Sequence, residues 1–222
     1  MPNGSFLLWY NTALLKKIGF VVSEGLPFIL PPLVLTIVCA LLNVWVAAIP
    51  IGILTLFFVW FFRFPAPPVP ENSSLVLSPA DGTVLGIRDI DDSPFSKRID
   101  IFMSVFNVHV NVSPSTGTIA RVLYRRGKKL RAGTDQASEI NESNYVEMTS
   151  EKGSIAFKQI AGILARRIVF YPVAGDELKQ GSPVGLIKFG SRVEVFLPPD
   201  VTIQVKKGDR VRAGQSVLAF WP

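Results

Sequence analysis

The chain contains one histidine, and it is the first residue whose type could support acid–base chemistry. His109 lies in the run Met103–Pro114, and histidine is the usual general base near neutral pH because its reference pKa is about 6.5. Side chains alternate along a β-strand, so Asn107, His109 and Asn111 are predicted to share a polar face. The pattern predicts a catalytic histidine on a strand, although a lone histidine is also typical of a structural position.

Two further segments have residue types that suit chemistry. Asp81 lies at a Pro-x-Asp-Gly turn, where Asp-Gly pairs also occur for conformational reasons alone. Gly190 and Ser191 interrupt a strand-like run from Leu186 to Pro198. Glycine permits a close approach to its carbonyl, and serine supplies a hydroxyl directly after it. The pair therefore indicates a nucleophile beside an accessible carbonyl, with a β-bulge as the simpler alternative.

Together these segments resemble the phosphatidylserine decarboxylase family, in particular its short bacterial and archaeal members. The likeness covers roughly residues 63–222. Four segments carry it: Ser78–Gly82, Asn107–Asn111, Ala161–Val169 and Phe189–Pro198. The most specific of these signals is the block Lys-Phe-Gly-Ser-Arg-Val at residues 188–193.

The resemblance implies a proenzyme that cuts itself between Gly190 and Ser191. The Ser191 hydroxyl would attack the Gly190 carbonyl, and elimination and hydrolysis would leave a pyruvoyl cofactor derived from Ser191. The products would be a large chain of residues 1–190 and a small chain of residues 191–222.

The resemblance further implies that the mature enzyme converts phosphatidylserine to phosphatidylethanolamine and carbon dioxide, through a Schiff base between the pyruvoyl ketone and the headgroup amine. It assigns His109 and Asp81 to this site. His109 would take the serine proton and later donate one to the product, and Asp81 would orient the imidazole. Longer bacterial relatives have a second histidine where this chain has Val112, so either one imidazole would serve both steps or another group would perform one of them. They also have Leu-Gly-Ser-Thr where this chain has Phe-Gly-Ser-Arg.

Basic side chains suggest contact with anionic lipid. Arg166 and Arg167 are candidates for the lipid phosphate because guanidinium groups bind phosphate in a bidentate way, and a solvated basic edge is the alternative. A second basic run, 125–131, is predicted to lie near anionic headgroups, because no aromatic interleaving typical of a nucleic-acid site accompanies it. The net charge of +6 agrees with this. With Cys39 as the single cysteine, neither an internal disulfide nor a Cys-based zinc site is expected, and no metal is predicted.

The elements that must position these residues are predicted to be mainly β-strands. Short β-prone runs, separated by Gly, Pro, Asp and Asn, continue over residues 74–220, and only 139–145 and 160–165 have a helical pattern. Gly-Asp turns at Gly175 and Gly208 stand 33 positions apart, with the rhythm of lipoyl- and biotinyl-type barrels. The predicted fold class is therefore mainly β: a barrel-like domain with duplicated lipoyl/biotinyl-like half-motifs.

Residues 1–62 are predicted to form a membrane-associated segment. Residues 25–62 contain no charged side chain. As one helix they would span roughly 57 Å, nearly twice the ~30 Å hydrocarbon thickness of a bilayer. An α-helical hairpin of two short spans, at about 26–42 and 46–62, is therefore expected, with a re-entrant segment as the alternative.

A Pro-rich linker is predicted at 63–73, followed by the decarboxylase domain at 74–222. Lys16, Lys17 and Arg63 flank the hairpin. The positive-inside rule places these cations in the cytoplasm. The predicted location is therefore the cell membrane, with the catalytic domain on the cytoplasmic side.

Two other functions fit parts of the sequence. A non-catalytic, membrane-anchored lipoyl-like adaptor would explain the apolar segment and the Gly-Asp turns, but it gives no role to His109 or to the Gly190–Ser191 pair. A decarboxylase of an archaeal ether-lipid serine headgroup would use the same chemistry. A carrier of biotin or lipoate has less support, because no lysine stands at a hairpin tip of the expected pattern. The sequence is compatible with a homo-oligomer and predicts no nucleic-acid partner.

Overall fold

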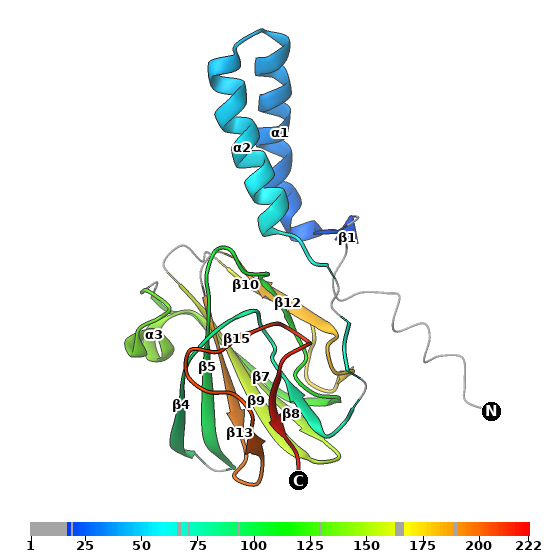
Figure 1. The fold of residues 1–222 in the computed structure, drawn as a ribbon, viewed down its shortest axis with the longest axis vertical. Helices are drawn as coiled ribbons and strands as arrows, with labels where there is room; N and C mark the ends of the chain where they lie inside the picture. Colours follow the sequence, from blue (N-terminus) through cyan, green and yellow to red (C-terminus); the bar gives the residue numbers. More distant parts are fainter. Residues whose placement is uncertain are drawn as a thin grey trace, which may run out of the picture. The chain divides into compact units, whose positions relative to one another are not determined.

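The computed structural model describes residues 17–222 apart from 19, 66–67, 71, 93, 129, 163–166 and 189–190 (Figure 1). The chain divides into two compact units, residues 1–65 and residues 66–222. Unit 1 is mainly helical in its described part, and unit 2 consists mainly of strands.

Unit 1 contains two apolar helices joined by a short turn. Helix α1 spans Leu26–Leu41 and helix α2 spans Trp45–Phe61. They follow a small hairpin and a 3₁₀ turn: β1 (Lys17–Ile18), β2 (Val21–Val22) and η1 (Ser23–Gly25). Asn43, with φ 60°, makes the turn between the helices, in a region that asparagine tolerates better than most residues. Helix α1 is continuous through Pro31 and Pro32, so these prolines do not break the segment.

By length and composition, one helical stretch of the described chain can cross a bilayer. It covers Ser23–Leu41, 19 residues with a mean hydropathy of 1.9, and α2 is apolar but shorter at 17 residues. The two threonine hydroxyls inside the helices donate to carbonyls one turn earlier, Thr36 to Pro32 O at 2.7 Å and Thr55 to Ile51 O at 2.9 Å. Each hydroxyl is therefore satisfied within its own helix.

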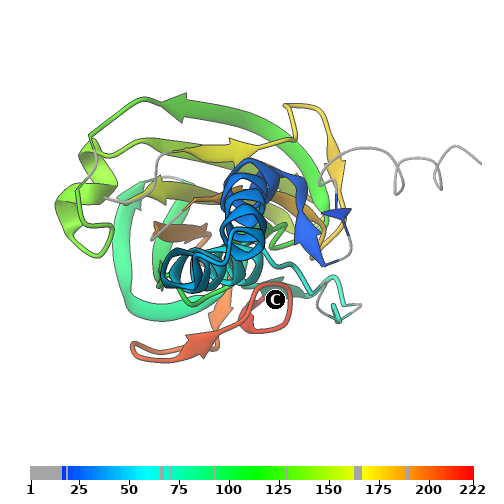
Figure 2. The ribbon, with the colours of Figure 1, turned by 90° about the horizontal axis from the view of Figure 1, so that it is seen from above.

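The core of unit 2 is an eight-stranded antiparallel sheet. Its strands, in order across the sheet, are β11 (Glu177–Leu178), β7 (Gly117–Arg125), β8 (Ser143–Ser150), β9 (Gly153–Ala161), β13 (Ser191–Leu197), β5 (Phe95–Met103), β4 (Gly82–Asp92) and β15 (Arg210–Val211). The sheet curls into a half-barrel (Figure 2). Register shifts between Val84 and Gly86 and between Ile119 and Arg121 bend the long strands, as bulges do.

Two three-stranded sheets and one short helix complete unit 2. One sheet has the order β10 (Ile168–Phe170), β12 (Pro183–Ile187), β6 (Val110–Val112), and the other has the order β14 (Thr202–Ile203), β16 (Val217–Phe220), β3 (Leu75–Leu77). Helix α3 spans Asp135–Ile140.

The prediction of a mainly β fold is confirmed. The two predicted local helices are wrong over most of their described residues, although α3 includes residues 139–140, and residues 163–165 of the second lie outside the described residues. Residues 143–145 begin β8 and residues 160–161 end β9, while the helix lies earlier, at α3. Ile160 and Ala161 pair with the central strand β13. Tertiary pairing of this kind overrides a weak local helical pattern.

The two Gly-Asp turns have the same hydrogen bonds. Gly175 and Gly208 have φ of 95° and 94°, a backbone conformation that favours glycine. In each turn the following residue, Asp176 or Asp209, accepts at 2.9 Å from the amide three residues earlier. Each glycine N–H also donates at 2.8 Å to a carbonyl of a long strand, β7 for Gly175 and β4 for Gly208.

The turns that precede β4 and β7 are matched as well. Both have the sequence Ser-Pro-x-x-Gly-Thr. In the first, Asp81 Oδ1 accepts from the amide of Ala213 at 2.8 Å. In the second, Thr116 Oγ1 accepts from the amide of Gln180 at 3.0 Å. A side-chain oxygen therefore closes both turns, but only one of the two turns has a carboxylate.

Candidate active site

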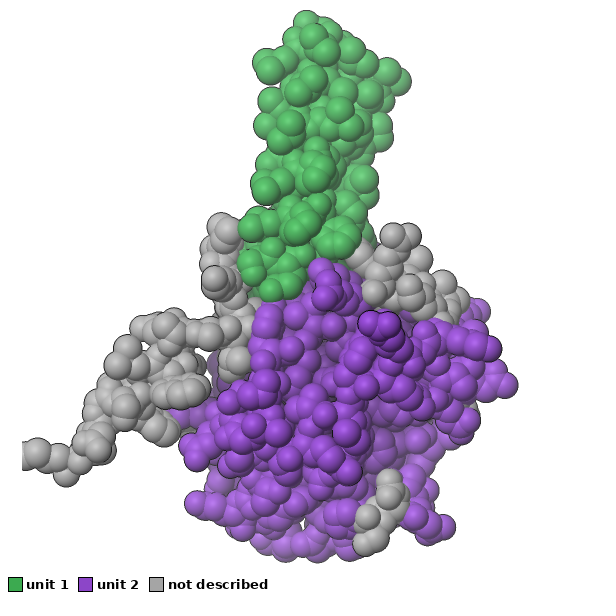
Figure 3. Space-filling view, turned by 180° about the vertical axis from the view of Figure 1, so that it is seen from behind, with its two compact units in different colours: residues 1–65 green, residues 66–222 purple. Residues whose placement is uncertain are grey.

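All the site residues described below belong to unit 2 (Figure 3). Ser191 is the first residue of β13, the strand between β5 and β9, and pairs with Met103 on one side and Ala161 on the other. The residue is fully buried. Its hydroxyl lies 3.2 Å from Met103 Sδ, and a thioether is a weak acceptor. The hydroxyl is therefore placed by packing rather than by a strong hydrogen bond to this sulfur.

A chain of buried amide side chains leads to the same methionine. Asn111 Nδ2 lies 3.7 Å from Met103 Sδ, and Asn111 Oδ1 accepts from Gln159 Nε2 at 2.8 Å. Gln159 in turn accepts from Asn144 Nδ2 at 3.2 Å. One signal in the sequence could have identified this chain: Gln159 alternates with apolar residues along β9, so it is a polar side chain on an apolar face.

His109 is buried and comes directly before β6. Its Nδ1 lies 2.9 Å from the carbonyl oxygen of Asn107. A carbonyl can only accept, so Nδ1 carries the proton and Nε2 is the basic nitrogen. The carbonyl of His109 accepts from the amide of Ile187 at 3.3 Å. His109 therefore lies beside the strand that leads to the Gly190–Ser191 bond.

Asn107 does not share a strand face with His109, contrary to the alternation expected from the sequence. Its Oδ1 accepts from the amide and the hydroxyl of Ser104, each at 2.8 Å. The local bonds of this asparagine close a turn, so the strand begins only at Val110.

Asp81 reaches His109 through one peptide group. Its Oδ2 accepts from the amide of Val108 at 3.3 Å, while Oδ1 binds Ala213. The carbonyl of the Asn107–Val108 peptide is the group that accepts from His109 Nδ1. The next residue, Gly82, is required by space, because an added Cβ would lie 2.3 Å from the Phe102 carbonyl oxygen.

Gly190 and Arg166, two of the predicted site residues, lie outside the described residues. Arg167 is exposed. Its carbonyl accepts from the amide of Lys188 at 3.2 Å, and Lys188 stands three residues before Ser191 in the chain. Burial and a 3.0 Å hydrogen bond to Glu142 raise the pKa of Tyr124, and Arg126 and Arg167 lower it.

Residues 191–222 are interleaved with the rest of unit 2. They contain β13, which lies between β5 and β9, β15, which pairs with β4, and β16, which pairs with β3. A cut before Ser191 would therefore leave the C-terminal piece embedded in the fold.

An open cavity of about 590 Å³ lies at the Thr116 turn, away from these residues. Hydroxyl side chains dominate its lining, among them Ser115, Thr116 and Thr149. Among the described residues, no group of three or more His, Cys, Asp or Glu side chains could hold a metal ion.

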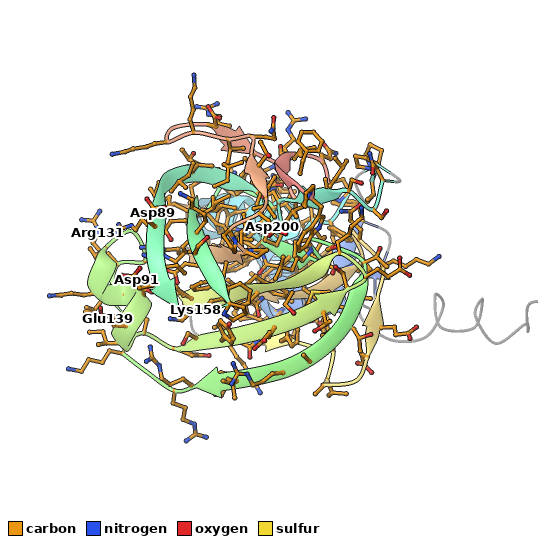
Figure 4. The ribbon with its side chains drawn as sticks, turned by 90° about the horizontal axis from the view of Figure 1, so that it is seen from below. Asp89, Asp91, Arg131, Glu139, Lys158 and Asp200 are labelled. Carbon is orange, nitrogen blue, oxygen red and sulfur yellow. The ribbon has the colours of Figure 1, made fainter. Side chains whose placement is uncertain are left out.

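Lys158 lies on the other face of the sheet, where it donates to the carbonyl of Ser138 in α3 at 2.7 Å (Figure 4). Burial lowers the pKa of Lys158, and Arg125, Arg98 and Arg192 lower it further, while Glu194 opposes the change. Lys158 thus shares the neighbourhood of Glu194 with three arginines. Among these cations the lysine is the one that can lose its charge.

We predict that Lys158→Met changes the pH dependence of stability. The folded pKa is below the unfolded value, so between the two the unfolded chain binds more protons and the wild-type free energy of unfolding rises with pH. The methionine variant lacks this rise. Its stability relative to wild type should therefore be greatest near pH 7 and fall as the pH approaches 10, as measured by urea unfolding in detergent at several pH values. A difference that is constant with pH would contradict the assignment.

The comparisons with known proteins identify the family of the chain. A family model described as phosphatidylserine decarboxylase matches residues 54–219. The chain belongs to the phosphatidylserine decarboxylase family. It is therefore an enzyme, and the match includes Asp81, His109 and Ser191.

Several curated relatives of this decarboxylase carry the name phosphatidylserine decarboxylase proenzyme. The protein of Symbiobacterium thermophilum is 42% identical over 207 residues, which are 91% of this chain and 96% of the relative. That of Carboxydothermus hydrogenoformans is 42% identical over 200 residues, covering 88% and 93%. A longer relative from Neisseria gonorrhoeae is 41% identical over 210 residues, covering 91% of this chain and 79% of its own length.

Proposed function

We propose that this decarboxylase cuts itself at Gly190–Ser191 and then converts phosphatidylserine to phosphatidylethanolamine and carbon dioxide. The observation that carries the proposal is the position of Ser191. It is a buried serine at the first position of a central strand, with its hydroxyl on a weakly accepting sulfur. The relatives' name, proenzyme, supports a cut during maturation.

The cleavage begins with Ser191 Oγ attacking the Gly190 carbonyl carbon. The C–N bond breaks and a C–O bond forms, which gives an ester and frees the amine of residue 191. Removal of the Ser191 Cα proton then expels the Gly190 carboxylate. The enamine that remains takes up a proton at Cβ, and water replaces its nitrogen, which leaves as ammonia. The balance is one water gained and one ammonia lost, so the two products together weigh about 1 Da more than the precursor.

His109 is the base that takes the hydroxyl proton, and Asp81 is the residue that holds His109 in place. The proton on Nδ1 leaves Nε2 free of hydrogen and basic. The Asp81 carboxylate binds the N–H of the same peptide whose carbonyl accepts from Nδ1. A charged acceptor polarises that peptide and strengthens its carbonyl as an acceptor, so Asp81 favours the imidazolium form indirectly.

The surroundings of Ser191 fit a pyruvoyl group. The group is small and uncharged, and the Ser191 side chain lies on the face that also holds Met103 and Val193. When present, the group supplies a ketone that forms a Schiff base with the substrate amine and acts as the electron sink for loss of carbon dioxide. His109 is the proton donor to the product carbon, and the polar chain through Asn111 and Gln159 fixes Met103, which packs against residue 191.

Arg167 is the proposed contact for the lipid phosphate, together with Arg126. Both are exposed. Arg126 stands two residues after Tyr124 in the chain, and Glu142, which accepts from Tyr124, also accepts from the Ile168 amide beside Arg167. Arg166 remains a proposal on the resemblance alone. The apolar helices of unit 1 would hold the enzyme at the cytoplasmic face of the cell membrane, where its substrate lies.

The matched turns also support the proposal of duplicated lipoyl-like half-motifs. The Gly-Asp turns, the Ser-Pro-x-x-Gly-Thr turns and the bulges of β4 and β7 recur with the same bonds in both halves. In this proposal only the half with Asp81 and His109 has catalytic groups. Thr116 and Ser74 stand at the equivalent places of the other half.

We predict that Asp81→Thr separates the structural and catalytic roles of Asp81. The matched turn shows that a threonine hydroxyl can close this turn, so the variant should fold with an unchanged midpoint of thermal unfolding. It lacks the second oxygen that binds Val108, so kcat should fall about 10- to 100-fold, as for a lost orienting hydrogen bond. The reciprocal variant, Thr116→Asp, is the control and should keep wild-type kcat. If Asp81→Thr has the same wild-type kcat as Thr116→Asp, Asp81 has no role in the mechanism.

The proposed function is tested by the intact mass of the purified wild-type chain and by turnover. We expect a small chain of about 3.5 kDa, the share of 32 residues in 24.4 kDa, with a ketone that reacts with a hydrazide. Mixed micelles containing phosphatidylserine should give phosphatidylethanolamine, and an archaeal ether-lipid analogue tests the alternative substrate. An intact chain that releases no carbon dioxide from either lipid would favour the adaptor and overturn the proposal.

A further inference from the structure

A buried ion network lies directly behind Ser191. Side chains alternate along β13, so Arg192 and Glu194 project from the face opposite Ser191. Arg192 Nη2 lies 2.7 Å from Asp100 Oδ2 and 3.0 Å from Glu194 Oε1. All three side chains are at most 1% exposed. The guanidinium thus bridges two carboxylates away from solvent.

The register of the sheet explains why a cation is needed between these two carboxylates. Glu194 is paired directly with Asp100 of β5, and like charges in directly opposed positions push two strands apart. Arg192 lies between them and converts this repulsion into attraction. Without Arg192, two buried carboxylates would oppose each other next to the start of β13.

The partners of Arg192 are themselves held in place. Asp100 also binds Arg98 Nε at 2.9 Å and Arg88 Nε at 3.1 Å. Glu194 Oε2 accepts from the Ser138 hydroxyl of α3 at 3.0 Å, and Arg192 Nη1 donates to Thr134 O just before α3 at 3.4 Å. Arg192 is therefore tied to β5, to its own strand and to the segment that covers the outer face of the sheet.

The position of Arg192 in the chain matters because of the cut. In the precursor, Ser191 is held by covalent bonds on both sides. After cleavage, which is the proposed function, residue 191 becomes the end of a chain and is held from one side only. Chain ends fray unless they are tied down. Arg192 is the first residue after the cut, and its side chain is bound at three places.

We propose that Arg192 is a positioning residue that anchors the new chain end and keeps the pyruvoyl-bearing residue on the inner face of the sheet. It acts through the backbone of β13 and does not touch the substrate. Arg192 is needed as an anchor only after the chain has been cut. Loss of Arg192 should therefore impair decarboxylation more than self-cleavage.

The test compares Arg192→Met and Arg192→Lys with wild type as full-length proteins in detergent. Self-cleavage is followed by intact mass, and kcat and KM are measured per ketone-bearing site. We expect Arg192→Met to cleave within about threefold of the wild-type rate and to lose about tenfold or more in kcat, as a small misplacement of a reacting group does. Its KM should change little. Lysine keeps the charge but not the fork geometry, so Arg192→Lys should be intermediate.

A second measurement does not depend on turnover. A frayed chain end is more accessible, so the rate of hydrazide labelling of the processed variant should rise about threefold or more above wild type. The control is Arg121→Met, which removes an exposed ion pair with Glu147 on β7 and β8 and should change neither rate. If Arg192→Met does not fold, labelling and kcat of Arg192→Lys decide the question.

Three results would overturn the proposal. The first is wild-type kcat in Arg192→Met. The second is an equal loss in cleavage and in kcat, which would mark Arg192 as a stability residue. The third is unchanged labelling. A wild-type chain that never cleaves would overturn the proposed function itself and this proposal with it, whereas a cleaved wild type with a normal Arg192→Met variant overturns only the role of Arg192.

Discussion

Ser191→Ala is expected to remain one chain of 24.4 kDa and to have no decarboxylase activity above background. The variant lacks the only oxygen that can attack the Gly190 carbonyl from this residue, so neither ester nor ketone can form. The loss of a hydroxyl on a thioether should change stability little, because sulfur is a weak acceptor. Intact mass, hydrazide labelling and carbon dioxide release are the three measurements.

A matched control separates chemistry from packing. Ser113 is also a fully buried serine whose hydroxyl lies near a methionine sulfur, at 3.6 Å from Met148 Sδ. Ser113→Ala should cleave normally, although the loss of its bond to Ser115 O costs some stability. Cleavage of Ser191→Ala at the same bond, or turnover by its uncleaved chain, would contradict the assigned role of Ser191.

His109→Ala should show the second large effect. We expect self-cleavage to slow by about 10² to 10⁴, the range for loss of a general base. The fraction that does cleave over days can be counted by hydrazide labelling, and kcat per labelled site should fall by a similar factor because the proton donor is missing. The kcat per labelled site tests whether the imidazole of His109 serves both self-cleavage and decarboxylation.

The other half of unit 2 again offers a control for this variant. The carbonyl of His109 accepts from Ile187, and the carbonyl of Ser74 accepts from Trp221 in the equivalent sheet. Ser74→Ala should have wild-type cleavage and turnover. Normal turnover per labelled site in His109→Ala would leave His109 with self-cleavage only and assign the product proton to another group.

The sequence predicted the parts of the site that depend on residue type, because few residues can do this chemistry. The single histidine, the Gly190–Ser191 pair within a strand-like run and the single Asp-Gly turn are visible without a fold. The contacts that link these residues could not be predicted from the sequence. Asp81 and His109 contact the same peptide, the one between Asn107 and Val108. No spacing in the sequence shows which peptide a carboxylate 27 residues away will bind.

Arg192 shows a second limit. A charged residue in a strand is usually solvent-facing, and the alternation along β13 gives no other indication. The residue is buried because α3 and the segment before it cover the outer face of the sheet. The pattern predicted a helix at 139–145, whereas α3 spans Asp135–Ile140, so most of the element that buries Arg192 was not predicted. Long-range cover of this kind depends on the tertiary fold, not on local sequence.

The interleaving of β13, β15 and β16 with the rest of unit 2 has a consequence for the life of the molecule. Before the cut, an unfolded chain can refold by itself, at a rate independent of protein concentration. After the cut, the strands from residue 191 onward can rejoin β3, β4, β5 and β9 only by meeting a second molecule, so recovery depends on concentration. The proposed cut would therefore turn the folding of one chain into an association between two chains, and an unfolded enzyme would regain its structure only where both chains are present.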